Sequence, residues 1–155
     1  MIEAIFIDFY GTVVFEDGEN VAKISQIIYE TGKAESVGEV GNYWWKRFKT
    51  LFENAYGERF KTQRELETQS LRETIEFFSS TADADALSNE MFEYWVAPPI
   101  FEESKEFFAK CPLPIYVVSN IDRDDILKAL AYHGLKPAGA FTSEDAKSYK
   151  PRKEL

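Results

Sequence analysis

The sequence predicts an α/β fold in which a parallel β-sheet core is interrupted by an inserted bundle of helices. Two short apolar runs, residues 3–8 and 114–119, have the composition of strands buried in a parallel sheet. Between them, residues 19–96 show helical spacing of apolar side chains and no strand pattern. Strands that alternate with helices are typical of βαβ units, so both runs are expected in one sheet.

The elements before the insertion point and within it follow from these patterns. The first strand, near residues 3–8, is expected to be buried on both faces and is broken by Gly11-Thr12. Helices are then predicted near residues 19–32, 43–57, 66–78 and 83–96, each with apolar side chains at helical spacing. Helices that follow one another with no strand among them predict an inserted helical bundle.

The chain returns to the sheet at Pro98-Pro99, which cannot continue a helix. A helix near 102–110 precedes the second strand, Asp122 is expected to cap the next helix, and Gly134 to end it. A third, short strand is predicted at 138–142. The resulting domains are a core made of residues 1–15 and 98–155 and a helical cap made of residues 16–97.

Composition narrows the functional class. The chain has 155 residues, is 45% hydrophobic and carries a formal net charge of -9. An acidic chain lacks the basic surface that nucleic acid or an anionic membrane requires, so neither partner is expected. A single cysteine rules out an internal disulfide and fits a reducing compartment, and we expect a cytoplasmic protein with a small anionic substrate.

The candidate nucleophile is Asp8, at the end of the first strand. A strand end holds a carboxylate in place, and the glycine of Gly11-Thr12 lets the backbone turn tightly, so that nearby N–H groups face an anionic substrate. A carboxylate in this setting can form a covalent ester that water then hydrolyses. The competing interpretation is an aspartate that only caps the loop.

Two further segments carry polar groups to the same edge of the sheet. Ser119 and Asn120 end the second strand and can donate hydrogen bonds to an anion, although Ser-Asn is also an ordinary helix-start signal. Lys150, before Pro151, can place an ammonium group near Asp8. The order of the three segments, rather than any one of them, indicates a catalytic site.

These segments resemble the three motifs of the haloacid dehalogenase superfamily with a helical cap after the first strand. Residues 8–12 (Asp-Phe-Tyr-Gly-Thr), 117–120 (Val-Val-Ser-Asn) and 143–151 match its first, second and third motifs. The resemblance implies a Rossmann-like core. It implies that Asp8 is the nucleophile, that Ser119 binds the anionic group and that Lys150 holds the charge of Asp8. It also implies substrate-binding or supporting roles for the remaining motif residues: Tyr10, Thr12 and Asn120.

Tyr10 decides between two branches of this superfamily. Phosphatases carry a second aspartate there as acid and base, whereas a phenol, with an ordinary pKa near ~10, is poorly matched to that cycle. The pattern resembles 2-haloacid dehalogenases, in which the halide leaves without a proton and no cofactor is needed. The alternative is a Mg²⁺-dependent small-molecule phosphatase, in which Asp8 would also be a metal ligand.

Dehalogenation also calls for a halide cradle on the cap side. Arg47 and Arg59 are candidate cations, and an aromatic wall could come from neighbouring side chains, although a cap core is the favoured interpretation of these aromatics. They are Tyr43, Trp44 and Trp45.

The resemblance further implies two later strands and an acidic motif that the sequence does not contain. We therefore expect an incomplete sheet with the first strand as an exposed apolar edge, open to pairing or swapping with a second chain. We also expect little activity from this chain alone. A non-catalytic or interaction remnant is the third functional alternative.

Overall fold

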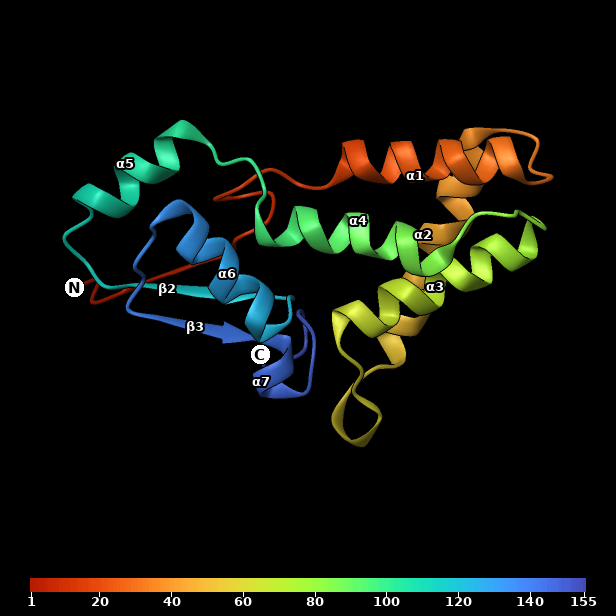
Figure 1. Ribbon diagram of the computed structural model, residues 1–155. Helices are drawn as coiled ribbons and strands as arrows, with labels where there is room; N and C mark the ends of the chain where they lie inside the picture. The colour runs from red at the N-terminus through yellow and green to blue at the C-terminus, as the bar shows by residue number, and fades with distance from the viewer. The chain divides into compact units, whose positions relative to one another are not determined.

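The computed structural model describes residues 1–155, which separate into two compact units (Figure 1). Residues 1–16 and 95–155 form the first unit, and residues 17–94 form the second. The boundaries predicted from the sequence, after residue 15 and before residue 98, differ from these by only a few residues. Each unit is described separately below.

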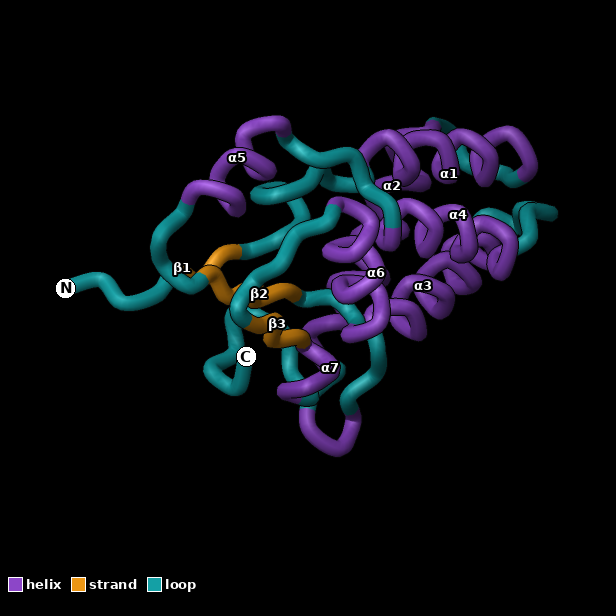
Figure 2. Tube along the Cα trace, turned by 60° about the vertical axis from the view of Figure 1, so that its left-hand side comes forward, coloured by secondary structure: helices purple, strands orange, loops and turns teal.

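The first unit contains a parallel sheet with the strand order β1-β2-β3, drawn in orange in Figure 2. The strands are β1 (Ile5–Ile7), β2 (Ile115–Ser119) and β3 (Gly139–Thr142). Ile7 pairs with Val117 and Ser119 pairs with Thr142, so the carboxyl ends of all three strands lie at one edge. The sheet is thus the predicted parallel one, and the end of β1 lies beside the end of β2.

Three helices belong to the first unit: α5 (Glu102–Lys110), α6 (Arg123–His133) and α7 (Ser143–Ala146). Gly134 ends α6 in a left-handed conformation with φ of 67°, as its sequence position predicted. Asp122 occupies the N-cap position, but its side chain makes no capping hydrogen bond, so the predicted cap is wrong in that respect. The sequence did not predict α7, which is one turn long and starts with a capping box.

The two faces of the sheet differ in burial. Ile115 and Val117 are 6% and 0% exposed, and both views place α6 beside β2 (Figures 1 and 2). On the opposite face, Phe6 and Phe141 are 66% and 48% exposed. The ring of Phe6 stacks on the ring of Tyr116, and the ring of Phe141 lies tilted to it with 6.1 Å between the centroids. Burial of the first strand on both faces, expected from its composition, is therefore wrong at Phe6.

A tight turn follows β1. The carbonyl oxygen of Phe9 accepts hydrogen bonds from the amides of Thr12, Val13 and Val14, at 3.3, 2.7 and 3.1 Å. Gly11 has φ of 77°, a backbone conformation that favours glycine. The turn brings the chain back on itself immediately after Asp8.

The second unit is a helical bundle. Its helices are α1 (Gly18–Thr31), α2 (Val37–Asn54), α3 (Gln63–Phe77) and α4 (Ala84–Val96), whose last two residues belong to the first unit, with a 3₁₀ turn at Gly57–Arg59. Side chains of Ser36 and Thr62 accept amide hydrogen bonds at the starts of α2 and α3. The bundle core is apolar and fully buried at Ile24, Ile28, Val40, Leu66, Leu71 and Met91. None of the helices in the structure combines the length and apolar character needed to cross a lipid bilayer.

Candidate active site

Asp8 and Lys150, which are far apart in the sequence, form an ion pair at the carboxyl end of the sheet. Lys150 Nζ lies 2.8 Å from Asp8 Oδ1, and their side chains are 29% and 48% exposed. The same oxygen accepts the backbone N–H of Phe9 at 2.8 Å. Asp8 Oδ2 makes no hydrogen bond within the protein. One oxygen of the carboxylate is therefore held by two donors, and the other is open.

Lys150 is itself held from two directions. Its ammonium group donates a second hydrogen bond to the carbonyl oxygen of Val118, at 2.9 Å. The Asn120 side chain accepts from Lys150 N–H at 2.7 Å and donates to the Lys150 carbonyl at 3.3 Å. Both ends of this amide are thus used on one peptide segment, which fixes the backbone from which the ammonium group reaches Asp8.

Ser119 ends β2 next to this pair. The strand register places it beside the end of β1, because Ile7 pairs with Val117 two residues earlier. The residue is only 2% exposed, and its hydroxyl makes no hydrogen bond within the protein. The hydroxyl is therefore available to donate to an anion bound at the carboxyl end of the sheet.

Two of the predicted substrate contacts are placed differently. The Tyr10 hydroxyl donates to the backbone carbonyl of Trp95 at 2.5 Å. Thr12 is exposed, and its hydroxyl makes no hydrogen bond within the protein, although its backbone amide takes part in the turn. Asn120, the third of these residues, is bonded to Lys150 as described above. The structure therefore brings Lys150 into contact with both Asp8 and Asn120, with Tyr10 and Thr12 on the turn that follows Asp8.

The donor atoms at this corner do not by themselves fit a Mg²⁺ ion. The structure contains no group of three or more histidine, cysteine or acidic side chains arranged to hold a metal. Mg²⁺ requires near-octahedral oxygen coordination. At Asp8 an ammonium group and an amide hold Oδ1, which leaves Oδ2 as the open carboxylate oxygen.

The candidate halide-binding groups lie in the second unit. Arg47 pairs with Glu73, with its Nε 2.6 Å from Glu73 Oε2, and Arg59 lies over the ring of Tyr56 at 5.1 Å. Trp44 is 4% exposed and donates to the hydroxyl of Ser70. The aromatic side chains divide accordingly: Trp44 is cap core, Tyr43 stacks on Phe77, and Trp45 is 64% exposed.

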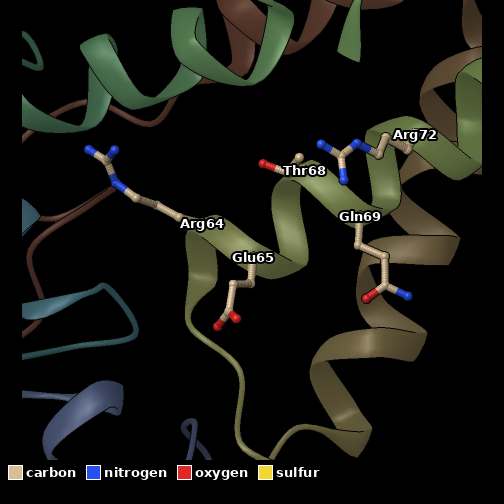
Figure 3. A pocket seen from close by; sticks show the side chains of 5 residues that line it. All are labelled: Arg64, Glu65, Thr68, Gln69 and Arg72. Carbon is tan, nitrogen blue, oxygen red and sulfur yellow. The ribbon is translucent and has the colours of Figure 1, made fainter. Parts of the chain in front are cut away.

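A separate hollow of about 510 Å³ is lined by side chains of α3 (Figure 3). Its cations are engaged within the second unit: Arg72 pairs with Asp85 at 2.5 Å, and Arg64 lies over the ring of Phe92 at 4.3 Å. The other residues that line it are Glu65, Thr68 and Gln69. Its one carboxylate, Glu65, accepts hydrogen bonds from the amide and the hydroxyl of Thr62 at the start of α3. The candidate active site is therefore the Asp8 corner of the first unit, where the carboxylate keeps an open oxygen.

Sequence reasoning missed the backbone partners of the site. The carbonyls of Val118 and Trp95 receive Lys150 and Tyr10, and a carbonyl carries no residue-type signal. It also missed that Asn120 binds Lys150. The order of the motifs predicted that Asn120 and Lys150 lie near each other. It did not predict which atoms of the two residues form hydrogen bonds.

The fold is similar to that of 2-haloacid dehalogenases of known structure. The L-2-haloacid dehalogenase from Xanthobacter autotrophicus matches with a TM-score of 0.71 and 17% identity, covering 99% of this chain and 62% of that one. A defluorinating L-2-haloacid dehalogenase matches with a TM-score of 0.70 and 18% identity, over 99% of this chain and 65% of that one. The predicted haloacid dehalogenase-type fold is confirmed.

A further match is a haloacid dehalogenase-type hydrolase from Bacillus subtilis, YfnB, in a structure bound to magnesium. It has a TM-score of 0.69 and 17% identity, and the match covers 98% of this chain and 70% of that one. No protein-family model and no curated protein sequence matches the chain. The chain spans about 62% of the length of the Xanthobacter dehalogenase, so the similarity concerns the fold of the part that it covers.

Proposed function

We propose that this chain carries the nucleophile of a hydrolase. The enzyme displaces halide from 2-haloalkanoic acids through a covalent ester at Asp8. The observation that supports it most is the asymmetry of the Asp8 carboxylate. Lys150 and the Phe9 amide hold Oδ1, whereas Oδ2 makes no hydrogen bond within the protein. A carboxylate fixed through one oxygen presents the other in a defined direction.

In the first step, Asp8 Oδ2 attacks the halogen-bearing carbon. A carbon–oxygen bond forms, the carbon–halogen bond breaks, and the halide leaves with the bonding electron pair. Lys150 offsets the negative charge of the reactants, and the Ser119 hydroxyl donates to the substrate carboxylate. In the second step, water adds to the Asp8 ester carbonyl. The 2-hydroxy acid leaves, one proton is released, and the carboxylate is regenerated.

Tyr10 favours halide over phosphate esters as the substrate class. An alkoxide leaving group needs a proton donor, and the Tyr10 hydroxyl already donates its proton to the Trp95 carbonyl. Halide leaves without a proton, so this reaction does not need the missing acid. Anion binding by Ser119 and charge support by Lys150 serve both reactions and do not discriminate between them.

A magnesium-dependent phosphatase is the second candidate. The similarity to YfnB, whose structure is bound to magnesium, supports it. The tyrosine at position 10 weighs against it, because its hydroxyl already donates to the Trp95 carbonyl.

The two candidates differ in their requirement for metal. Purified protein is incubated with L- and D-2-chloropropionate in the presence of a chelator, and released chloride is measured. In parallel, phosphate release from p-nitrophenyl phosphate is measured with Mg²⁺. Chloride release that disappears in Asp8→Asn supports the dehalogenase proposal. Magnesium-dependent phosphate release without chloride release would replace it with the phosphatase. No turnover of either substrate would agree with the little activity expected from this chain alone and would show that it carries out neither reaction by itself.

Isotope labelling tests the covalent step directly. In a single turnover in H₂¹⁸O, water attacks the Asp8 ester carbonyl, so the label should enter the Asp8 carboxylate and not the 2-hydroxy acid. Mass spectrometry of the peptide that contains residue 8 measures this. Label in the product of the first turnover would instead show direct attack by water.

A further inference from the structure

We propose that Tyr10 is a positioning residue whose hydroxyl links the orientation of Asp8 to the return segment, defined here as residues 95–101. This segment carries the chain from the end of α4 back into the first unit. The consequence for catalysis rests on the proposed function of Asp8, whereas the mechanical link can be tested without turnover.

Tyr10 is held at both ends of its side chain. Its hydroxyl donates to the Trp95 carbonyl at 2.5 Å, across 85 residues of sequence. Its ring meets the ring of Phe9 edge-on, with 5.2 Å between the centroids, and Phe9 is fully buried. A phenol fixed by a hydrogen bond and an aromatic contact has little freedom to serve as an acid or to follow a substrate.

The same turn connects Tyr10 to the nucleophile. The backbone of Tyr10 bridges to Val14, and the Gly11 amide donates to the Val14 carbonyl at 2.8 Å. The residue before Tyr10 supplies the amide that holds Asp8 Oδ1 at 2.8 Å. Only two peptide units separate the tethered ring from that carboxylate, so a displacement of Tyr10 moves the Phe9 amide with it.

The return segment is anchored to the first unit by other contacts as well. The Phe15 amide donates to the Pro99 carbonyl at 2.9 Å, and the Phe101 amide donates to the Val13 carbonyl at 3.3 Å. His133 at the end of α6 places its Nε2 2.7 Å from the Pro98 carbonyl oxygen and donates to it as the Nε2–H tautomer. Tyr10 and His133 thus hold the same segment from the turn and from α6.

Halide displacement needs no acid at position 10, so Tyr10 can serve instead to position the Asp8 turn. Displacement requires the attacking oxygen to lie in line with the carbon–halogen bond, and a small misplacement costs much of the rate. A residue at position 10 with no acid role can be used to keep the Asp8 turn in place. The tether should therefore affect the rate of attack more than substrate binding, which depends on Ser119 and Lys150.

The test is amide hydrogen exchange in Tyr10→Phe, followed residue by residue by NMR. The variant loses only the hydroxyl, and the matched control is Tyr116→Phe, because the Tyr116 hydroxyl on the open sheet face makes no hydrogen bond within the protein. Loss of one hydrogen bond should speed exchange of the Phe9 amide roughly threefold to tenfold in Tyr10→Phe. Exchange in Tyr116→Phe should stay at the wild-type rate. Wild-type exchange of the Phe9 amide in Tyr10→Phe would overturn the proposal.

A double-mutant cycle with His133→Leu, which removes the donor to the Pro98 carbonyl, separates a link from two independent anchors. Loosening the return segment from α6 should speed Phe9 exchange only while Tyr10 is present to transmit the change. We expect His133→Leu to act on the Phe9 amide in the wild type and to have no added effect in Tyr10→Phe. Equal effects of His133→Leu in both backgrounds would show that Tyr10 transmits nothing and would overturn the link.

Steady-state kinetics of chloride release test the catalytic consequence of the tether separately. In Tyr10→Phe, kcat for chloride release should fall about tenfold, with KM within a factor of about two. A rise in KM at unchanged kcat would contradict a positioning role. If the wild type releases no chloride, the proposed function fails, while the exchange results still decide whether the tether exists.

Discussion

Two carboxyl groups of this chain, Asp8 in the first unit and Glu67 in the second, lie in opposite surroundings. Asp8 is half exposed and meets an ammonium group and a backbone amide on one oxygen. Glu67 is 5% exposed in α3, and its Oε1 has no hydrogen-bond partner. Burial, reinforced by the negative charge of Asp17 and only partly opposed by a hydrogen bond from Trp44, raises the pKa of Glu67 to about 8.

The difference shows what a carboxyl group needs in order to react. Charge at Asp8 is supported by donors and by solvent, so a carboxylate can act there as a nucleophile. Glu67 has a hydrogen bond from Trp44 but almost no contact with solvent, so burial favours its neutral form. A buried acid of this kind is a structural group rather than a second active site, and the following predictions test that division.

Removal of the proposed nucleophile, Asp8, should have the largest effect. In Asp8→Asn, the amide cannot form the ester, and we expect chloride release to fall by roughly 10³-fold or more. The measurement is the initial rate of chloride release from 2-chloropropionate. The control is Asp124→Asn, an exposed acid in the first turn of α6, which should retain wild-type activity.

Loss of the ammonium group should come next. Lys150→Met keeps the length of the side chain but leaves Asp8 without its counter-charge, and we expect kcat to fall about 10²-fold or more. Lys136→Met removes an exposed lysine of the same unit and serves as the matched control. Equal rates in Lys150→Met and the wild type would remove Lys150 from the mechanism.

Glu67→Gln should change stability rather than activity. Because the folded-state pKa is raised to about 8, from an ordinary value of 4.5, the folded protein holds this proton more tightly than the unfolded chain. The contribution of Glu67 to the free energy of unfolding is therefore full below pH 4.5 and is lost as the pH rises from 4.5 to about 8. Glutamine does not titrate, so we expect Glu67→Gln to be about 1–3 kcal/mol more stable than wild type at pH 8, with little difference at pH 4.

Urea unfolding at the two pH values measures this effect. Glu76→Gln, which changes an exposed acid of the same helix, provides the control and should show no such pH dependence. A Glu67→Gln variant that is less stable than wild type at pH 8 would mean that Glu67 is ionised and paired in the folded protein.

The smallest effect is expected at Asn120. Asn120→Ala removes the two hydrogen bonds that hold the backbone of Lys150, each of which contributes about 1 kcal/mol. We expect kcat to fall about threefold to thirtyfold, with KM nearly unchanged, because the ammonium group remains but is less well placed. A rise in KM with unchanged kcat would instead indicate that Asn120 contacts the substrate.

The sequence predicted best those elements that hydrophobic periodicity and the positions of proline and glycine are enough to define. The parallel strands, the helical insertion and α5 at Glu102–Lys110 follow from periodicity and from proline and glycine positions. It failed at Phe6, whose exposure depends on what covers one face of the sheet, and at the one-turn helix α7, which is too short to show a period. Burial of a strand face is set by other elements of the fold, so strand composition alone does not determine it.

The amino-acid sequence by itself determined that a carboxylate stands at the end of the first strand, that a lysine follows the third, and that a tyrosine lies two residues after the carboxylate. These are identities at strand ends, where parallel strands bring their carboxyl termini together. Only the tertiary structure decided that Lys150 meets Asp8 through one oxygen, that Asn120 holds the lysine backbone, and that the Tyr10 hydroxyl reaches the Trp95 carbonyl. These contacts join segments far apart in the chain, and two of them use backbone atoms that every residue carries. The direction in which Asp8 presents its open oxygen is therefore a property of the folded chain rather than of any motif.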